Sequence, residues 1–166
     1  MYRSIEEFIG DYSRERESTL KIMKALDDAS LAQRANPESR PLGRMAWHIV
    51  TAVGEMMNRT GLEVKGPGDD APVPAIAAEI VAAYDATTSS LLEQVQTKWT
   101  TESLGIVVDM YGEQWPNAVT LQVLIRHEIH HRAQMTVLMR LAGLAVPGVY
   151  GPSREEWTAY GMPPQE

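Results

Sequence analysis

The 166-residue sequence predicts an all-α protein, a four-helix bundle with a long crossover connection. Three observations favour this class. Apolar residues recur every three or four positions in four long segments. The connections between these segments are uneven in length and concentrate Pro and Gly, and almost no segment alternates as a strand would. We expect residues 1–166 to form one domain, because this length suits one.

The first two helices are predicted from apolar spacing and from helix breakers. Residues 4–28 read as one amphipathic helix, and Ser4 followed by Glu7 resembles a capping box at its start. A breaker at 35–37 ends this region, and a second helix is expected from about 42 to 59. The apolar positions of the first helix are spaced mostly by three or four residues: Ile5, Phe8, Ile9, Tyr12, Leu20, Met23 and Leu26.

A loop and a third helix follow. Residues 61–74 are rich in Pro and Gly, which predicts a loop, and a third helix is expected from about 75 to 98. Residues 99–119 are irregular in pattern. Within them, residues 106–108 (IVV) fit either a short strand or a packed loop, and the pattern does not decide between the two.

The fourth helix is predicted to begin near Asn117 or Thr120 and to end at Gly143, a residue type typical of the position after a helix. A Pro- and Gly-rich connection follows it. Residues 153–157 then begin a short last helix.

Composition excludes several classes of function. The net charge of −7 disfavours general binding to nucleic acid or anionic membranes, which requires basic patches. The absence of Cys excludes disulfides, a thiolate metal site and a cysteine nucleophile. The N-terminus lacks the pattern of a signal peptide and no apolar stretch reaches the length of a membrane span, so we expect a soluble cytoplasmic protein.

Histidines are the strongest functional signal. His127 and His131 are four residues apart in the fourth helix, so both project from the same face and can share one metal ion. His48 lies in the second helix. Three imidazoles from two helices can hold a divalent metal and leave coordination positions open, which a catalytic metal needs.

Helical geometry assigns directions to the neighbouring side chains. With Leu124 at the centre of the buried stripe, His127 and His131 face the bundle interior, and His130 is rotated toward the flank. On the second helix, Glu55 shares a side with His48, so it is a candidate extra ligand, ligand partner or proton carrier. For Glu55 and Glu128, an ordinary carboxylate on the helix surface is the favoured interpretation.

A second interpretation arises from residues 127–131, which match the literal HExxH pattern of zinc peptidases. That reading requires a third ligand downstream, for which Glu155 or Glu156 would serve. It also requires a substrate cleft, commonly walled by a sheet edge, and it leaves His48 unexplained. We rank it below the bundle with three histidine ligands.

Residues 42–49 (LGRMAWHI) and 126–134 (RHEIHHRAQ), with the order of helices around them, resemble the DinB/YfiT-like family. The resemblance implies a metal-binding four-helix bundle, often dimeric, with nickel or zinc held by His48, His127 and His131. Some relatives use low-molecular-weight thiols such as bacillithiol or mycothiol. The sequence departs from the common His-Arg-Gly-Gln ending at Ala133, where a methyl group is tolerated in a helix.

The leading functional hypothesis is therefore a metal-dependent thiol S-transferase acting on a small electrophilic substrate, as a homodimer. The alternative is a non-catalytic metal-binding or stress-response protein, and a hydrolase is a further reading of the site. Whether the protein is an enzyme stays open at this point. Glu55, Glu128 and His130 are the candidates for proton transfer. Arg44, Arg126 and Arg132 are the candidates for binding a carboxylate of the thiol or substrate, although a surface ion pair is the favoured interpretation for each.

Overall fold

The structure is a computed structural model that describes residues 1–164. Four long helices dominate it, and a two-stranded antiparallel sheet and three short 3-10 helices lie in the connections. The fold is the predicted all-α class. The long helices are α1 (Ile5–Met23), α2 (Leu42–Asn58), α3 (Ala77–Lys98) and α4 (Asn117–Leu141); the other elements are η1 (Ala29–Ala32), η2 (Thr101–Gly105), β1 (Val107–Met110), β2 (Glu113–Pro116) and η3 (Glu156–Tyr160).

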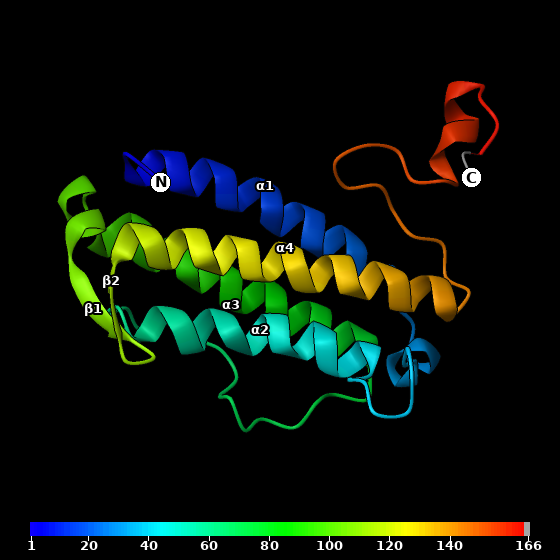
Figure 1. Cartoon of the computed structure of the whole chain (residues 1–166), viewed down its shortest axis with the longest axis horizontal. Coiled ribbons are helices and arrows are strands. Elements are labelled where there is room, and N and C mark those ends of the chain that lie inside the picture. Colours follow the sequence, from blue (N-terminus) through cyan, green and yellow to red (C-terminus); the bar gives the residue numbers. More distant parts are fainter. Residues whose placement is uncertain (165–166) are drawn as a thin grey trace.

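The four helices form a bundle in which α1 and α2 each pack against both α3 and α4 (Figure 1). Helices α2 and α3 run in the same direction, so the chain must return along the whole bundle between them (Figure 1). The segment 59–76 makes this return and is the long crossover. The irregular segment 99–116 instead stays at one end of the bundle, where it carries the hairpin (Figure 1).

The first helix is shorter than its apolar pattern predicted. It ends at Met23, and the residues up to 28 lead into η1. At its start, the hydroxyl of Ser4 accepts a hydrogen bond from the backbone N–H of Glu7 at 3.3 Å. The carboxylate of Glu7 accepts from the N–H of Arg3 rather than from that of Ser4, so half of the capping box forms.

The segment that the sequence left undecided is a β-hairpin. Val107 pairs with Pro116 and Met110 with Glu113, so the turn contains only Tyr111 and Gly112. Both turn residues have positive φ, 60° and 86°, as a type I′ turn requires. Tyr111 therefore adopts a backbone conformation that residues with a Cβ rarely take.

A polar layer divides the core at the middle of the bundle. One apolar cluster lies at one end and includes Met45, Ile80 and Met135, and a second lies at the other end and includes Phe8 and Leu121. Between them, buried polar side chains meet from α1, α3 and α4. These side chains are Glu15, Thr19, Thr87, Thr88, Glu128 and Arg132.

Hydrogen bonds connect this layer. Nη2 of Arg132 donates to Oε2 of Glu15 at 2.6 Å, and its Nη1 donates to the hydroxyl of Thr19 at 3.0 Å. Thr19 and Tyr84 in turn donate to Oε1 of Glu128, at 2.6 and 2.5 Å. The network ties α4 to both α1 and α3.

Among the described residues, no helix combines the length and apolar composition needed to cross a lipid bilayer.

We predict that the buried ion pair between Arg132 and Glu15 is a major stability determinant. Arg132→Met leaves the Glu15 carboxylate buried without its cation and should lower the free energy of unfolding by about 3–5 kcal/mol. The double variant with Glu15→Leu should recover part of this loss. Urea denaturation monitored by circular dichroism measures both.

Arg140→Met is the matched control, because Arg140 pairs with Glu155 at the surface and its loss should cost under about 1 kcal/mol. Equal losses for Arg132→Met and Arg140→Met would show that the buried pair contributes no more to the free energy of unfolding than the surface pair.

Candidate metal centre

Three histidines from two adjacent helices converge on one point. His48 lies near the middle of α2, and His127 and His131 lie one turn apart on α4. Nε2 of His127 is 3.1 Å from Nε2 of His48 and 3.1 Å from Nε2 of His131. Among the described residues, this is the one group of three or more His, Asp or Glu side chains whose donor atoms lie within 4.8 Å of one another.

The three side chains lie on the flank of the bundle rather than at its centre. Glu128 and Arg132 occupy the interior positions of α4 at this level, with exposed fractions of 1% and 2%. The buried stripe is therefore centred near Glu128, rotated about 40° from Leu124, since four helical residues turn about 400°. His127 and His131 are half-buried and face α2, where His48 meets them.

This placement corrects the expectations for Glu128 and Arg132. Neither is a surface side chain: Glu128 is bonded to Thr19 and Tyr84, and Arg132 to Glu15. Both were expected at the surface because a carboxylate and a guanidinium are rarely buried unless a distant partner neutralises them. Both are bonded on the side of α4 that faces α1 and α3, so neither is available to a ligand at the histidines.

Gln134 orients one of the three imidazoles. Its Oε1 lies 2.7 Å from Nδ1 of His131, and an amide oxygen can only accept, so Nδ1 carries the proton. The lone pair of His131 is then on Nε2, which points at the cluster. Metal-binding histidines commonly have such a partner on the second ring nitrogen.

The environment keeps the imidazoles neutral. Burial is the largest cause that lowers the pKa of His48 to about 4, and the neighbouring His131, Arg40 and Arg44 contribute to the same shift. Burial and the neighbouring histidines lower the pKa of His127 to about 4, and burial also lowers that of His131. Metal ligation requires the neutral ring, so all three are in the ligating form at neutral pH.

The separations of the nitrogens fit a shared metal ion. Two nitrogens bound at about 2.1 Å to one ion lie about 3.0 Å apart at a right angle and about 3.4 Å apart at the tetrahedral angle. The observed separations of 3.1 Å fall between these values. The donor set is therefore compatible with a divalent metal.

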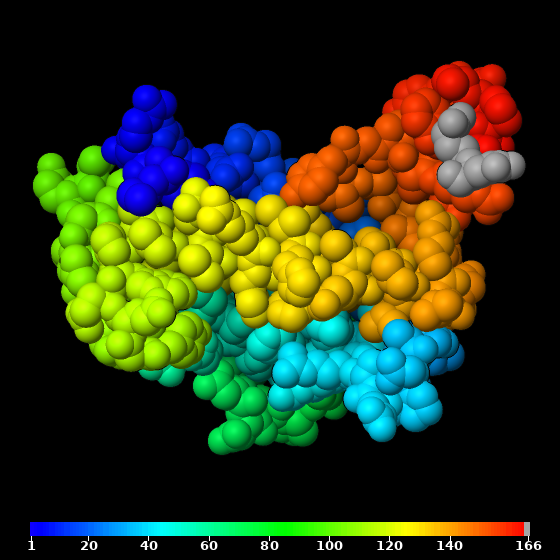
Figure 2. All heavy atoms as spheres, in the orientation of Figure 1, coloured from blue at the N-terminus to red at the C-terminus, as the bar shows by residue number. Residues whose placement is uncertain are grey.

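A cavity of about 560 Å³ adjoins the cluster, and His48 and His127 form part of its wall. The space-filling view shows this face of the molecule, with α2 visible below α4, between the hairpin and the segment that precedes α2 (Figure 2). The cavity gives a ligand access to the histidines. Its other lining residues are Arg40, Arg44, Thr51, Ala52, Glu55, Met56, Asp69, Tyr111 and Val123.

Glu55 is fixed on this wall by two donors. Nε of Arg59 donates to its Oε1 at 2.9 Å, and the hydroxyl of Tyr111 donates to its Oε2. The guanidinium of Arg59 also stacks over the Tyr111 ring, 4.9 Å from its centroid. The left-handed backbone of Tyr111 thus places its side chain on the cavity wall. Glu55 is outside the cluster of converging nitrogens, but its charge is near enough to act toward a higher pKa of His48 and His127.

The remaining candidates lie elsewhere. His130 and Arg126 are exposed, and neither lines the cavity. Glu155 pairs with Arg140, and Glu156 pairs with Lys21 and accepts from two backbone N–H groups. Neither glutamate joins the histidines, so the third ligand of the peptidase reading is missing among the described residues.

Four residues at the site were not predicted from the sequence. Arg40 lies before Pro41 and outside α2, so helical spacing does not place it beside Arg44 and His48. Tyr111 has a weak signal in the Tyr-Gly pair of a two-residue turn. Gln134 belongs to the motif, but its role depends on a side-chain contact. Asp69 lies in the Pro- and Gly-rich loop, and nothing in the pattern points to it.

We predict that the metal-free protein loses stability as the pH falls from 7 to 5. The pKa of His48 is about 4 in the folded state and about 6.5 in the unfolded state. Between these values the unfolded chain binds the extra proton, so stability rises with pH and falls on acidification. Urea denaturation in chelator at pH 7 and pH 5 measures the difference.

The variant His48→Gln isolates this contribution, because it cannot take up the proton. Its stability should change less between the two pH values than that of the unchanged protein. An identical slope in both proteins would show that His48 does not have a lowered pKa.

Comparison with known proteins places the chain among similar folds and sequences. The model of the DinB family matches residues 1–166. The uncharacterized protein YrdA of Bacillus subtilis (strain 168) is 40% identical over 162 residues, which cover 98% of this chain and 97% of YrdA. A crystal structure of a DinB-like protein from Bacillus cereus ATCC 10987 has 45% identity and a TM-score of 0.88, covering 90% of this chain and 100% of that chain.

A second crystal structure, of the DinB-like protein YjoA from Bacillus subtilis, has a TM-score of 0.68 and covers 86% of this chain and 97% of that chain. Its identity is 17%, so the likeness is one of fold alone. The family match spans the whole sequence, and the resemblance seen in the two histidine motifs is confirmed. The chain belongs to the DinB family.

Proposed function

We propose that the protein binds one divalent metal through His48, His127 and His131 and transfers a low-molecular-weight thiol to a small electrophile. The observation that carries this proposal is the convergence of three Nε2 atoms beside an accessible cavity, whose wall includes His48 and His127. A structural metal is enclosed by its ligands, whereas this arrangement leaves one side open to the cavity.

The donor set supports nickel or zinc, because imidazole suits both. Three neutral ligands leave the full charge of the metal, which would lower the pKa of a thiol and supply a thiolate nucleophile at neutral pH. The chain has no cysteine, so the thiol comes from a small molecule.

Glu55 is the proton acceptor in this proposal. It is the one member of the three proton-transfer candidates that lines the cavity, since His130 is exposed outside it and Glu128 is buried against α1 and α3. Arg59 and Tyr111 fix its two oxygens, so it presents a positioned carboxylate to a bound thiol. Of the three arginine candidates, Arg44 alone lines the cavity.

We predict that each of His48→Ala, His127→Ala and His131→Ala lowers metal affinity by at least tenfold, because each removes one of three ligands. The metal content of purified protein and competition with a chelator measure this. His130→Ala is the matched control, since this exposed histidine is on the same helix but outside the cluster, and it should keep one metal per chain. Stoichiometric metal in His48→Ala would refute the three-histidine site.

We further predict thiol binding and metal-dependent transfer. Bacillithiol, mycothiol, glutathione and cysteine are titrated into cobalt- or nickel-loaded protein, and the thiol that binds should shift the metal's absorption spectrum. That thiol should then be conjugated to monochlorobimane only when metal is present. Glu55→Gln should lower the conjugation rate about 100-fold.

Glu63→Gln serves as the control for the carboxylate, because Glu63 is exposed, pairs with Lys98 and does not line the cavity. If no thiol shifts the spectrum and no metal-dependent conjugation occurs, the transferase proposal fails. A non-catalytic metal-binding protein would then be the better description.

A further inference from the structure

The cavity beside the histidines separates its charges by sign. Arg40 and Arg44 line it near the start of α2, whereas Glu55 and Asp69 line it near the end of that helix. The eleven residue steps from Arg44 to Glu55 correspond to about 16 Å along the helix axis. His48 lies between the two ends, and the wall there is neutral, with Thr51, Ala52, Met56 and Val123.

The two arginines at one end of the cavity are available to bind a ligand. Within the described residues, neither Arg40 nor Arg44 makes an ion pair, although acidic residues outnumber basic ones by 22 to 15 in this chain. Two unpaired arginines at one cavity favour an anionic group there, because guanidinium groups bind carboxylates with two parallel hydrogen bonds.

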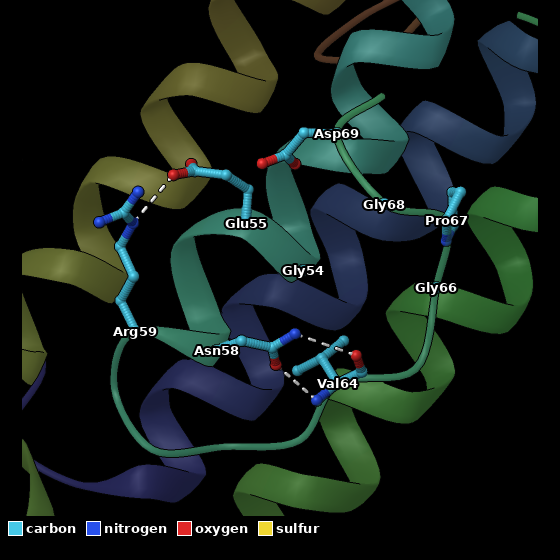
Figure 3. A pocket seen from close by; sticks show the side chains of 9 residues that line it. All are labelled: Gly54, Glu55, Asn58, Arg59, Val64, Gly66, Pro67, Gly68 and Asp69. Atoms are coloured by element: carbon cyan, nitrogen blue, oxygen red, sulfur yellow. Dashed lines mark hydrogen bonds and ion pairs between the residues drawn. The ribbon is translucent and has the colours of Figure 1, made fainter. Parts of the chain in front are cut away.

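The opposite end has an uncompensated negative charge. Figure 3 shows the Asp69 side chain pointing toward Glu55, whose carboxylate turns to Arg59. Among the residues that the structure describes, Asp69 has neither a hydrogen-bond nor an ion-pair partner, so one cation serves two carboxylates. A second cation at this end would balance the charge.

We propose that the cavity takes a small zwitterionic thiol, with its carboxylate at Arg40 and Arg44 and its ammonium group at Asp69 and Glu55. This inference rests on the proposed function, and it names the substrate class of that site. The neutral middle of the wall suits an uncharged linkage between the two charged ends, and it passes the histidines, where the sulfur would lie.

The span of the cavity sets the size of this ligand. The charged side chains extend into the cavity, so the distance between their charged groups is shorter than the roughly 16 Å between helical positions 44 and 55. Arginine reaches further than aspartate or glutamate. The ammonium and carboxylate of a single amino acid share one carbon atom and are too close together for this span. Two residues extend over about 7 Å, so a dipeptide-sized thiol fits better.

The experiment compares four thiols that differ in their charged ends. Cysteinylglycine carries both charges, N-acetylcysteine only the carboxylate, cysteamine only the ammonium group, and 2-mercaptoethanol neither. Each is titrated at pH 7 into cobalt-loaded protein and followed by absorption spectroscopy and calorimetry. Cysteinylglycine should bind most tightly, about three- to tenfold more tightly than either singly charged thiol.

Two variants test the ends separately, and neither is at the proton acceptor Glu55. Arg44→Gln should weaken cysteinylglycine and N-acetylcysteine by about three- to tenfold and leave cysteamine unchanged. Asp69→Asn should weaken cysteinylglycine and cysteamine and leave N-acetylcysteine unchanged. The matched controls are Arg126→Gln and Asp70→Asn, whose residues are exposed and do not line the cavity. A purely structural role would weaken all thiols alike.

Serylglycine, which has the same charged ends but no sulfur, separates this inference from the thiol-transfer proposal. If it binds and its affinity falls in both Arg44→Gln and Asp69→Asn, the two ends of the cavity bind the charged groups as proposed, even if no thiol shifts the metal spectrum. The inference is overturned if both variants weaken all four thiols equally, or if neither variant weakens cysteinylglycine. In that case the metal site and its thiol chemistry can still stand.

Discussion

The buried ion pair between Arg132 and Glu15 is the interaction on which the middle of the bundle depends. Both charges are removed from water between two apolar clusters, so each of them needs hydrogen-bonded partners inside the protein. Arg132 meets this requirement by bonding Glu15 and Thr19, and Thr19 passes the network on to Glu128. Because the hydrogen-bonded partners come from α1, α3 and α4, the network fixes the axial position of α4 in the bundle.

That axial position determines where the histidines lie. His127 and Glu128 are adjacent in sequence, so their directions differ by about 100° around the helix, and His131 and Arg132 are related in the same way. One turn of α4 therefore presents two polar pairs, with Glu128 and Arg132 on the interior side and the two histidines toward α2. A shift of α4 along its axis would both break the buried network and separate His127 from His48. The structural network and the candidate centre share one constraint.

Apolar periodicity and breakers predicted the four helices, and a four-residue spacing placed His127 and His131 on one face, because these features depend on local spacing. His48 is 79 residues from His127, and the family resemblance joined it to the other two. The local patterns misassigned Glu128 and Arg132, since a carboxylate and a guanidinium are expected at the surface unless a distant partner neutralises them. Glu15 is 117 residues from Arg132 in the chain, and no local pattern reveals that contact. Asp69 and Tyr111 could not be found for the same reason: a crossover and a hairpin bring them to the cavity, and their types alone are unremarkable there.

The hairpin shows how the fold places chemistry at the edge of the cavity. A two-residue type I′ turn favours Asn or Gly at its first position, yet Tyr111 occupies it here at φ 60°. Such a backbone is unfavourable for a residue with a large side chain, and it persists only where other contacts outweigh it. Those contacts are the hydrogen bond to Glu55 and the stacking on Arg59. The tyrosine thus occupies a position where glycine would fold more easily, and its side-chain contacts serve the cavity wall rather than the turn.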